Sequence, residues 1–193
     1  MRKVKNYVKE IQTSFLSCEK DLQLILKKLF LEYPEHAEAL KRLLIIGTKD
    51  CLDMSNLKYK EIVDRYSIKD MIDQGYIRRS PKIQIEEHEE IKSYILIFFD
   101  NFRPNPTNPE FRDCDIIFHV FSAIDYWELD NYSTRPLKIL GYIDGLLNKS
   151  RLTGIGTLLF SGAGQILTSS DYSGYSLTFN AIHGSDDLIP PEG

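Results

Sequence analysis

Residues 93–100 read Ser-Tyr-Ile-Leu-Ile-Phe-Phe-Asp, and residues 114–124 read Cys-Asp-Ile-Ile-Phe-His-Val-Phe-Ser-Ala-Ile. Both runs are short, apolar and rich in β-branched and aromatic side chains, which is typical of buried strands. We expect the two runs to pair with each other in an antiparallel manner. The second run is apolar on both of its faces, which predicts a central strand that is covered on both sides.

The segment between these strands, residues 101–113, contains three prolines and three asparagines. It is longer than an ordinary hairpin loop, and its prolines lower its conformational freedom. A long, stiff loop that projects from a sheet is expected to make a contact. We therefore predict a contact surface here, and the candidate residues are Phe102, Arg103, Asn105, Pro106, Asn108 and Arg112. Trp127 follows in a polar turn and is added as an exposed aromatic anchor.

A helix is predicted after this turn, because Arg135-Pro136 places a proline at the favoured first position. Ser133 or Thr134 is expected to cap it. Its buried stripe is expected to comprise Leu137, Leu140, Ile143 and Leu147, flanked by Ile139 and Leu146, while Gly141 and Gly145 would allow a close backbone approach.

Strand character then returns in residues 156–160, 165–168 and 175–183. Gly162, Gly164 and Ser173-Gly174 indicate turns between these strands. The order from residue 93 onward is therefore β-β-α-β-β. We predict an α+β fold in which a mainly antiparallel sheet carries one long helix.

The first eighty residues are predicted to be helical. Apolar residues recur at helical spacing from Val4 to Phe30, a second helix follows Pro34, and Ser67 to Asp70 have capping-box spacing ahead of Gly75. Residues 76–85 are a possible edge strand. The predicted organisation is a helical region at 1–80, an α+β domain at 81–184 and a mobile or docking tail at 185–193.

Composition excludes several classes of function. The chain has 193 residues and a net charge of -4, which is divided into +1 over residues 1–90 (17 basic, 16 acidic) and -5 over residues 91–193 (7 basic, 12 acidic). An acidic chain of this kind lacks the basic field that holds nucleic acid or an anionic membrane. The longest apolar run, Tyr94 to Phe99, is too short for a membrane helix.

The cysteines and the N-terminus bear on where the protein is expected to reside. Cys18, Cys51 and Cys114 form no CxxC pair, which indicates free thiols in a reducing compartment. The basic N-terminus is not followed by an apolar signal-peptide core.

No constellation of residues predicts an enzyme, a cofactor or a metal site. The glycine pairs at 154–156 and 162–164 lack the third glycine of a dinucleotide loop and the lysine of a phosphate loop. Four carboxylates near the strand ends could converge on a divalent ion, but solvated strand ends are the favoured explanation: Asp100, Glu110, Asp113 and Asp115. His119 and His183 lie in strands and are expected to be structural. A metal-dependent nuclease remains the least favoured alternative.

The second half of the chain resembles the neck and tail-completion proteins of tailed bacteriophages, in the tail-terminator-like class. The resemblance covers residues 93–184 and rests on these phrases: Phe98-Phe-Asp-Asn-Phe-Arg103, Asn108-Pro-Glu-Phe-Arg112, Ile116-Ile-Phe-His119, Arg135-Pro136, Leu152-Thr-Gly-Ile-Gly156 and Tyr172-Ser-Gly-Tyr175. The helical first half departs from the smaller members of that class.

The resemblance implies a virion structural subunit without an active site. Such proteins form oligomeric rings, often sixfold, which join the portal at the capsid vertex to the tail around the DNA channel. For this chain the resemblance implies a sixfold or twelvefold ring. The loop from Phe102 to Arg112 would then form a subunit interface with a neighbouring copy. Arg103 and Arg112 would be candidates for ion pairs with carboxylates of that copy, such as Asp125 or Glu128. DNA would pass the acidic second half without specific binding. The protein would be assembled in the host cytoplasm and reside in the virion. The alternative is an adaptor module that uses its N-terminal helices to bind a partner.

Overall fold

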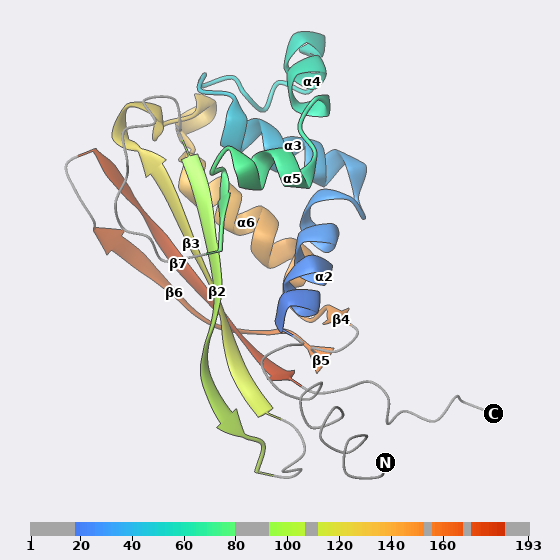
Figure 1. The fold of residues 1–193 in the computed structure, drawn as a ribbon. Helices are drawn as coiled ribbons and strands as arrows, with labels where there is room; N and C mark the ends of the chain where they lie inside the picture. The colour runs from blue at the N-terminus through green and yellow to red at the C-terminus, as the bar shows by residue number, and fades with distance from the viewer. Residues whose placement is uncertain (1–17, 80–92, 107–111, 153–155, 168–170, 184–193) are drawn as a thin grey trace.

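The computed structural model describes residues 18–79, 93–106, 112–152, 156–167 and 171–183. Its central feature is a five-stranded sheet with the order β1-β2-β3-β7-β6 (Figure 1). The strands are β1 (Ile77–Arg78), β2 (Ser93–Pro104), β3 (Arg112–Ala123), β6 (Leu159–Leu167) and β7 (Tyr172–His183). Strands β4 (Arg151–Leu152) and β5 (Gly156–Thr157) form a separate small hairpin. Only β1 runs parallel to its neighbour, so the prediction of an α+β fold with a mainly antiparallel sheet is confirmed.

Five helices are described: α2 (Cys18–Phe30), α3 (Pro34–Ile45), α4 (Leu57–Asp64), α5 (Ile68–Asp73) and α6 (Arg135–Leu147). Helix α6 lies over β3 and β7, α3 reaches β2, and α2 packs against both α3 and α6. Figure 1 shows these three helices on the same face of the sheet. The predicted helix from Val4 is therefore confirmed from Cys18 onward, and its first part lies outside the described residues.

Helix α5 begins and ends as predicted. The hydroxyl of Ser67 accepts a hydrogen bond from the backbone N–H of Asp70 at 3.2 Å, and the Asp70 carboxylate accepts one from the N–H of Ser67 at 2.9 Å. These two bonds form a capping box, which satisfies N–H groups that would otherwise lack partners in the first turn. Gly75 follows the helix with a φ of 81°. Glycine adopts this left-handed conformation without a steric penalty, so it can end the helix.

Strand β3 is central, as predicted, because it pairs with β2 on one side and β7 on the other. Its inner residues Cys114, Ile116, Phe118 and Val120 are fully buried beneath the helices. The opposite face is different, since Ile117 and His119 are only half-buried, while α2, α3 and α6 all lie on the inner face (Figure 1). We predicted that both faces of β3 are covered. Among the described residues, helices cover one of these faces.

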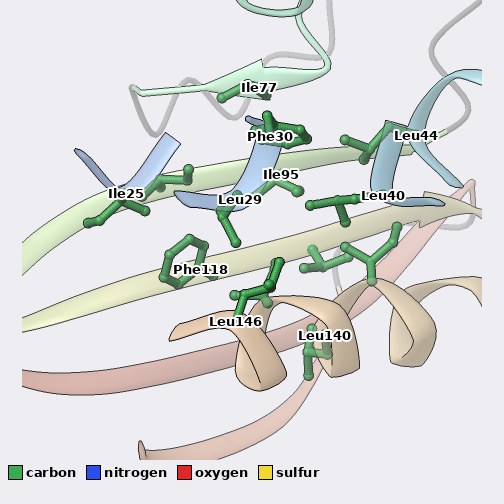
Figure 2. Close-up of a cluster of buried hydrophobic side chains, with 14 of the residues drawn as sticks. Ile25, Leu29, Phe30, Leu40, Leu44, Ile77, Ile95, Phe118, Leu140 and Leu146 are labelled. Carbon is green, nitrogen blue, oxygen red and sulfur yellow. The ribbon is translucent and has the colours of Figure 1, made fainter. Parts of the chain in front are cut away.

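The helices and the sheet share one hydrophobic core. Figure 2 shows side chains from α2, α3, α6 and the sheet in one cluster, including Leu29, Leu40, Ile95, Phe118 and Leu146. All five are at least nine-tenths buried. The described part of the predicted 1–80 region and the predicted 81–184 domain thus pack together, while the predicted tail at 185–193 lies outside the described residues.

The predicted buried stripe of α6 is confirmed for Leu140, Ile143 and Leu147, and the flanking Ile139 and Leu146 are buried as well. Leu137 was also expected to be buried but is 48% exposed. The reason is that Arg135 is itself buried and fixes the orientation of the first turn. Thr134 occupies the N-cap position, but its hydroxyl makes no capping hydrogen bond.

Two predicted loops are strands instead. β2 continues to Pro104 and β3 begins at Arg112, so the loop between them is shorter than residues 101–113. A proline is tolerated there because β1 pairs only with Ile95 and Leu96, so this part of β2 has no described neighbour on its outer side. Gly162 and Gly164 lie inside β6, with a bulge between Phe160 and Gly162, so the predicted turn is wrong. Pairing with β7 outweighs the weak strand preference of glycine.

Candidate functional site

The first candidate surface is the β2–β3 hairpin, which extends past the end of α2 (Figure 1). Phe102 and Arg103 lie in β2 and Arg112 lies in β3, rather than in a loop. The Phe102 ring stacks on Phe99 with 6.4 Å between ring centroids. The amide of Asn105 donates a hydrogen bond to the Asp113 carboxylate at 2.8 Å. These contacts extend the sheet into the projecting arm. Pro106 is exposed beyond them, and Asn108 lies outside the described residues.

A polar network joins three strands at the base of this arm. The Asp115 carboxylate accepts hydrogen bonds from the side-chain amides of Asn101 in β2, at 2.7 Å, and Asn180 in β7. The guanidinium of Arg103 lies 3.6 Å from the same carboxylate. Asn101 can direct its amide there because it adopts a φ of 50° at the bulge between Asp100 and Arg103. The network fixes the arm to the sheet, and it gives Arg103 a carboxylate partner in its own chain.

Trp127 does not join the hairpin. It follows a short 3-10 helix, Ile124–Tyr126, that begins after the last residue of β3, at the opposite end of the strand from Arg112. Its ring lies 6.3 Å from the ring of Tyr175 and borders a surface groove of about 560 Å³. Residues from two strands of the sheet and the preceding turn also line the groove, including Ile124, Gln165 and Leu167. The predicted interface residues therefore occupy two separate surfaces.

Of the predicted partner carboxylates, Glu128 lies 3.5 Å from the ammonium group of Lys49 in the same chain. Both side chains are well exposed, so the pair contributes little to stability. Asp125 lines the Trp127 groove. The inter-subunit pairing of Arg103 or Arg112 with these carboxylates stays a prediction.

A second groove, of about 680 Å³, runs along the outer side of α6. The sequence analysis missed it because Leu137 was assigned to the core and Gly141 and Gly145 to a close contact. Both glycines instead face open space. Tyr132 stands fully exposed at one end, with a φ of 59°, and His36 at the other side contacts the ring of Tyr142.

Arg135 is the most highly connected polar side chain in the described structure, and it was predicted only as a helix start. Its guanidinium is fully buried and donates to four backbone carbonyls, at 2.7–2.8 Å: Leu43, Ile46, Thr48 and Tyr126. Leu43 and Ile46 are at the end of α3, where helix carbonyls lack partners and attract a cation. Arg135 thus connects α3 to the start of α6.

The groups with potential chemistry are dispersed or buried. Among the described residues, no three His, Cys, Asp or Glu side chains are grouped as metal ligands, and Glu110 of the predicted cluster lies outside them. Burial raises the pKa of the Cys114 thiol to about 12, and burial also raises the pKa of the Cys51 thiol. Both thiols are therefore protonated and weakly nucleophilic at neutral pH. Burial between the Phe98 and Phe121 rings lowers the pKa of His119.

No described helix has the length and apolar character needed to cross a membrane. A search of curated proteins finds no match to the chain. The family model named YomW matches residues 37–181, which comprise most of the sheet, helices α4, α5 and α6, and α3 from its fourth residue onward. The family name derives from a Bacillus phage region, which marks the protein as phage-related. The match spans well over half of the chain, and we conclude that the protein belongs to the YomW family.

Proposed function

We propose that this protein is a structural subunit of a phage neck or tail-completion ring, which joins the portal at the capsid vertex to the tail around the DNA channel. The proposal places the chain in the virion, after assembly with copies of itself in the host cytoplasm. The finer assignment, to the tail-terminator-like class, rests on the resemblance of residues 93–184. The phage-related family name is consistent with it.

The observation that carries the proposal is the projecting β2–β3 arm. Its base is held by Asp115, which links β2, β3 and β7, and its outer part by the bond from Asn105 to Asp113. A rigid arm loses little conformational entropy when it binds, so it is suited to reach a neighbouring subunit. The arm and the Trp127 groove lie at opposite ends of the sheet, and a closed ring needs two different surfaces of this kind.

The structure offers less support for the adaptor alternative. Such a module would bind its partner with the apolar faces of its N-terminal helices. In α2 and α3 these faces include Ile25, Leu29, Leu40 and Leu43, all of which are fully buried in the core of the same chain. A partner would have to displace the sheet to reach them.

The proposal can be tested by co-expressing the full chain with the portal and tail proteins of a phage that encodes it. We expect a ring of defined stoichiometry in native mass spectrometry and electron microscopy. Pro106→Glu adds a charge to the exposed arm and should abolish the ring, whereas Leu57→Glu, at a 69% exposed position on α4, should not. A chain that stays monomeric with every neck and tail protein would refute the proposal.

A further inference from the structure

Strand β6 is an exposed sheet edge without the usual protection. It pairs only with β7 among the described strands, so alternate backbone N–H and C=O groups point away from the sheet. Its nine residues, Leu-Phe-Ser-Gly-Ala-Gly-Gln-Ile-Leu, include no charge and no proline. Three large apolar side chains are exposed on it: Leu159 at 52%, Phe160 at 50% and Leu167 at 80%. An edge of this kind is a template for another strand.

The opposite edge of the sheet shows how this protein protects a strand. Beyond the short β1, the outer side of β2 carries Asp100, Arg103 and Pro104, together with a bulge between Asp100 and Arg103. Charges, prolines and bulges are the devices that prevent edge pairing. β6 has one bulge, near its start, and neither of the other devices. The difference between the two edges indicates that β6 has a strand partner.

The order of side-chain types along β6 is the same when it is read from either end. Ala163 is at its centre, flanked by two glycines, then by Ser161 and Gln165, and then by apolar residues at both ends. Two antiparallel copies centred on Ala163 would place glycine opposite glycine, polar opposite polar and apolar opposite apolar. We propose that β6 pairs with β6 of a second copy of this chain, about a twofold axis through Ala163, and so joins two sheets edge to edge.

The surroundings of β6 favour a second copy over an unrelated strand. In this arrangement the Leu159 end of the partner lies beside Leu167, which borders the Trp127 groove. Ile124, 48% exposed, lines the same groove and offers an apolar surface to the partner's leucine and phenylalanine. The bulge between Phe160 and Gly162 limits strict register to the centre of the strand, where the side chains are smallest, so the outer polar and apolar residues of the two copies lie near each other without regular pairing. Because β6 carries no charge, two copies bring no like charges together.

This inference does not rest on the proposed ring. A twofold contact closes after two copies, whereas a ring requires a head-to-tail contact between different surfaces. The two contacts use different parts of the molecule, β6 in one case and the β2–β3 arm in the other. The purified chain tests the first without any neck or tail protein.

The first measurement is the mass of the full chain in solution by light scattering, over a range of concentrations. We expect a dimer whose fraction rises with concentration. Ala163→Lys places a charge at the centre of the exposed edge and should give a monomer with unchanged circular dichroism. Leu57→Lys adds the same charge at a 69% exposed site on α4 and should leave the dimer intact. A monomeric wild type, or a dimer that Ala163→Lys does not weaken, overturns the proposal.

Disulfide trapping tests the register of the pair. In Ala163→Cys the two introduced thiols face each other across the axis, at a separation that a disulfide can span. In Leu167→Cys they are four residues from the axis on each copy, about 27 Å apart at roughly 3.4 Å per residue. Mild oxidation should therefore trap only the Ala163→Cys dimer, with the wild type as a control for the native cysteines. Equal trapping at both sites would indicate a parallel or unspecific contact and would reject the twofold antiparallel pair.

Discussion

Replacing Arg135 by methionine should destabilise the protein strongly, because this one side chain satisfies four backbone carbonyls from two parts of the fold. Methionine preserves most of the apolar stem and removes every donor. The carbonyls of Thr48 and Tyr126 are in partly buried bonds and can recover water, whereas those of Leu43 and Ile46 are in buried bonds and cannot. A buried acceptor left without a partner costs about 1–3 kcal/mol. Two of them give about 2–6 kcal/mol, a large part of a typical stability of about 5–15 kcal/mol.

The assay is urea unfolding, followed by circular dichroism and by the fluorescence of Trp127, the one tryptophan of the chain. Its carbonyl accepts a hydrogen bond from the Arg135 N–H, so its ring reports on the same junction. Arg135→Lys keeps the charge but has three donors on one atom, so an intermediate loss is expected. Lys138→Met, at an exposed position of α6, removes the same charge and should change stability by less than about 0.5 kcal/mol. A loss below about 1 kcal/mol for Arg135→Met would show that water reaches the freed carbonyls and would refute the reasoning.

Three further predictions concern the sheet. In Gly174→Ala the added methyl would lie 1.8 Å from the carbonyl oxygen of Val120, so the free energy of unfolding measured in urea should fall by about 3 kcal/mol or more. The control is Gly164→Ala, whose methyl meets open space and should leave the stability nearly unchanged. Burial lowers the pKa of His119, so the unfolded chain binds the proton more tightly, and the free energy of unfolding should fall as the pH drops below about 6.5. His119→Gln should remove this pH dependence, and a variant with the same pH profile as the wild type would contradict the prediction. Asp115→Leu removes the acceptor that links β2 and β7 to β3, so amide hydrogen exchange should become faster in the β2–β3 arm only, and the free energy of unfolding should fall by about 1–3 kcal/mol. If exchange in the arm stays slow, the Asp115 network does not hold the arm in place.

The elements that sequence reasoning predicted well are those with strong local patterns. The apolar runs of β2 and β3 predict buried strands without any knowledge of the rest of the fold. The capping box from Ser67 to Asp70 fixes the start of α5 by hydrogen bonds within one turn. Both signals are local, since the residues that make the contacts are close together in sequence. The order β-β-α-β-β follows from them.

The errors arise where a long-range contact overrides a local preference. Gly162 and Gly164 resemble turn residues, but their backbones are held in β6 by pairing with β7, which comes later in the chain. Leu137 has the spacing of a core residue, but the burial of Arg135 against α3, about ninety residues earlier, rotates it outward. Sequence reasoning rarely places a charged residue in a core, because burying the charge is costly unless hydrogen-bond acceptors surround it. These acceptors come from distant parts of the chain that only the folded structure brings together. The candidate site was therefore predicted in part: the arm was identified, and the exposed edge and both grooves were not.

The separation of the predicted interface residues bears on how copies of this chain can assemble. Arg112 and Trp127 lie at opposite ends of β3, whose twelve residues span roughly 40 Å at about 3.4 Å per residue. A single contact with one neighbour cannot easily include both ends. If each end contacts a different copy, the two surfaces differ, and contacts between different surfaces continue from subunit to subunit until they close as a ring. A β6 pair would add a twofold axis to such a ring, would double its number of subunits and would make its two faces identical, whereas a ring that joins a portal to a tail has two different faces. The stoichiometry of the assembled particle, compared between the wild type and Ala163→Lys, therefore distinguishes a single ring from a paired one.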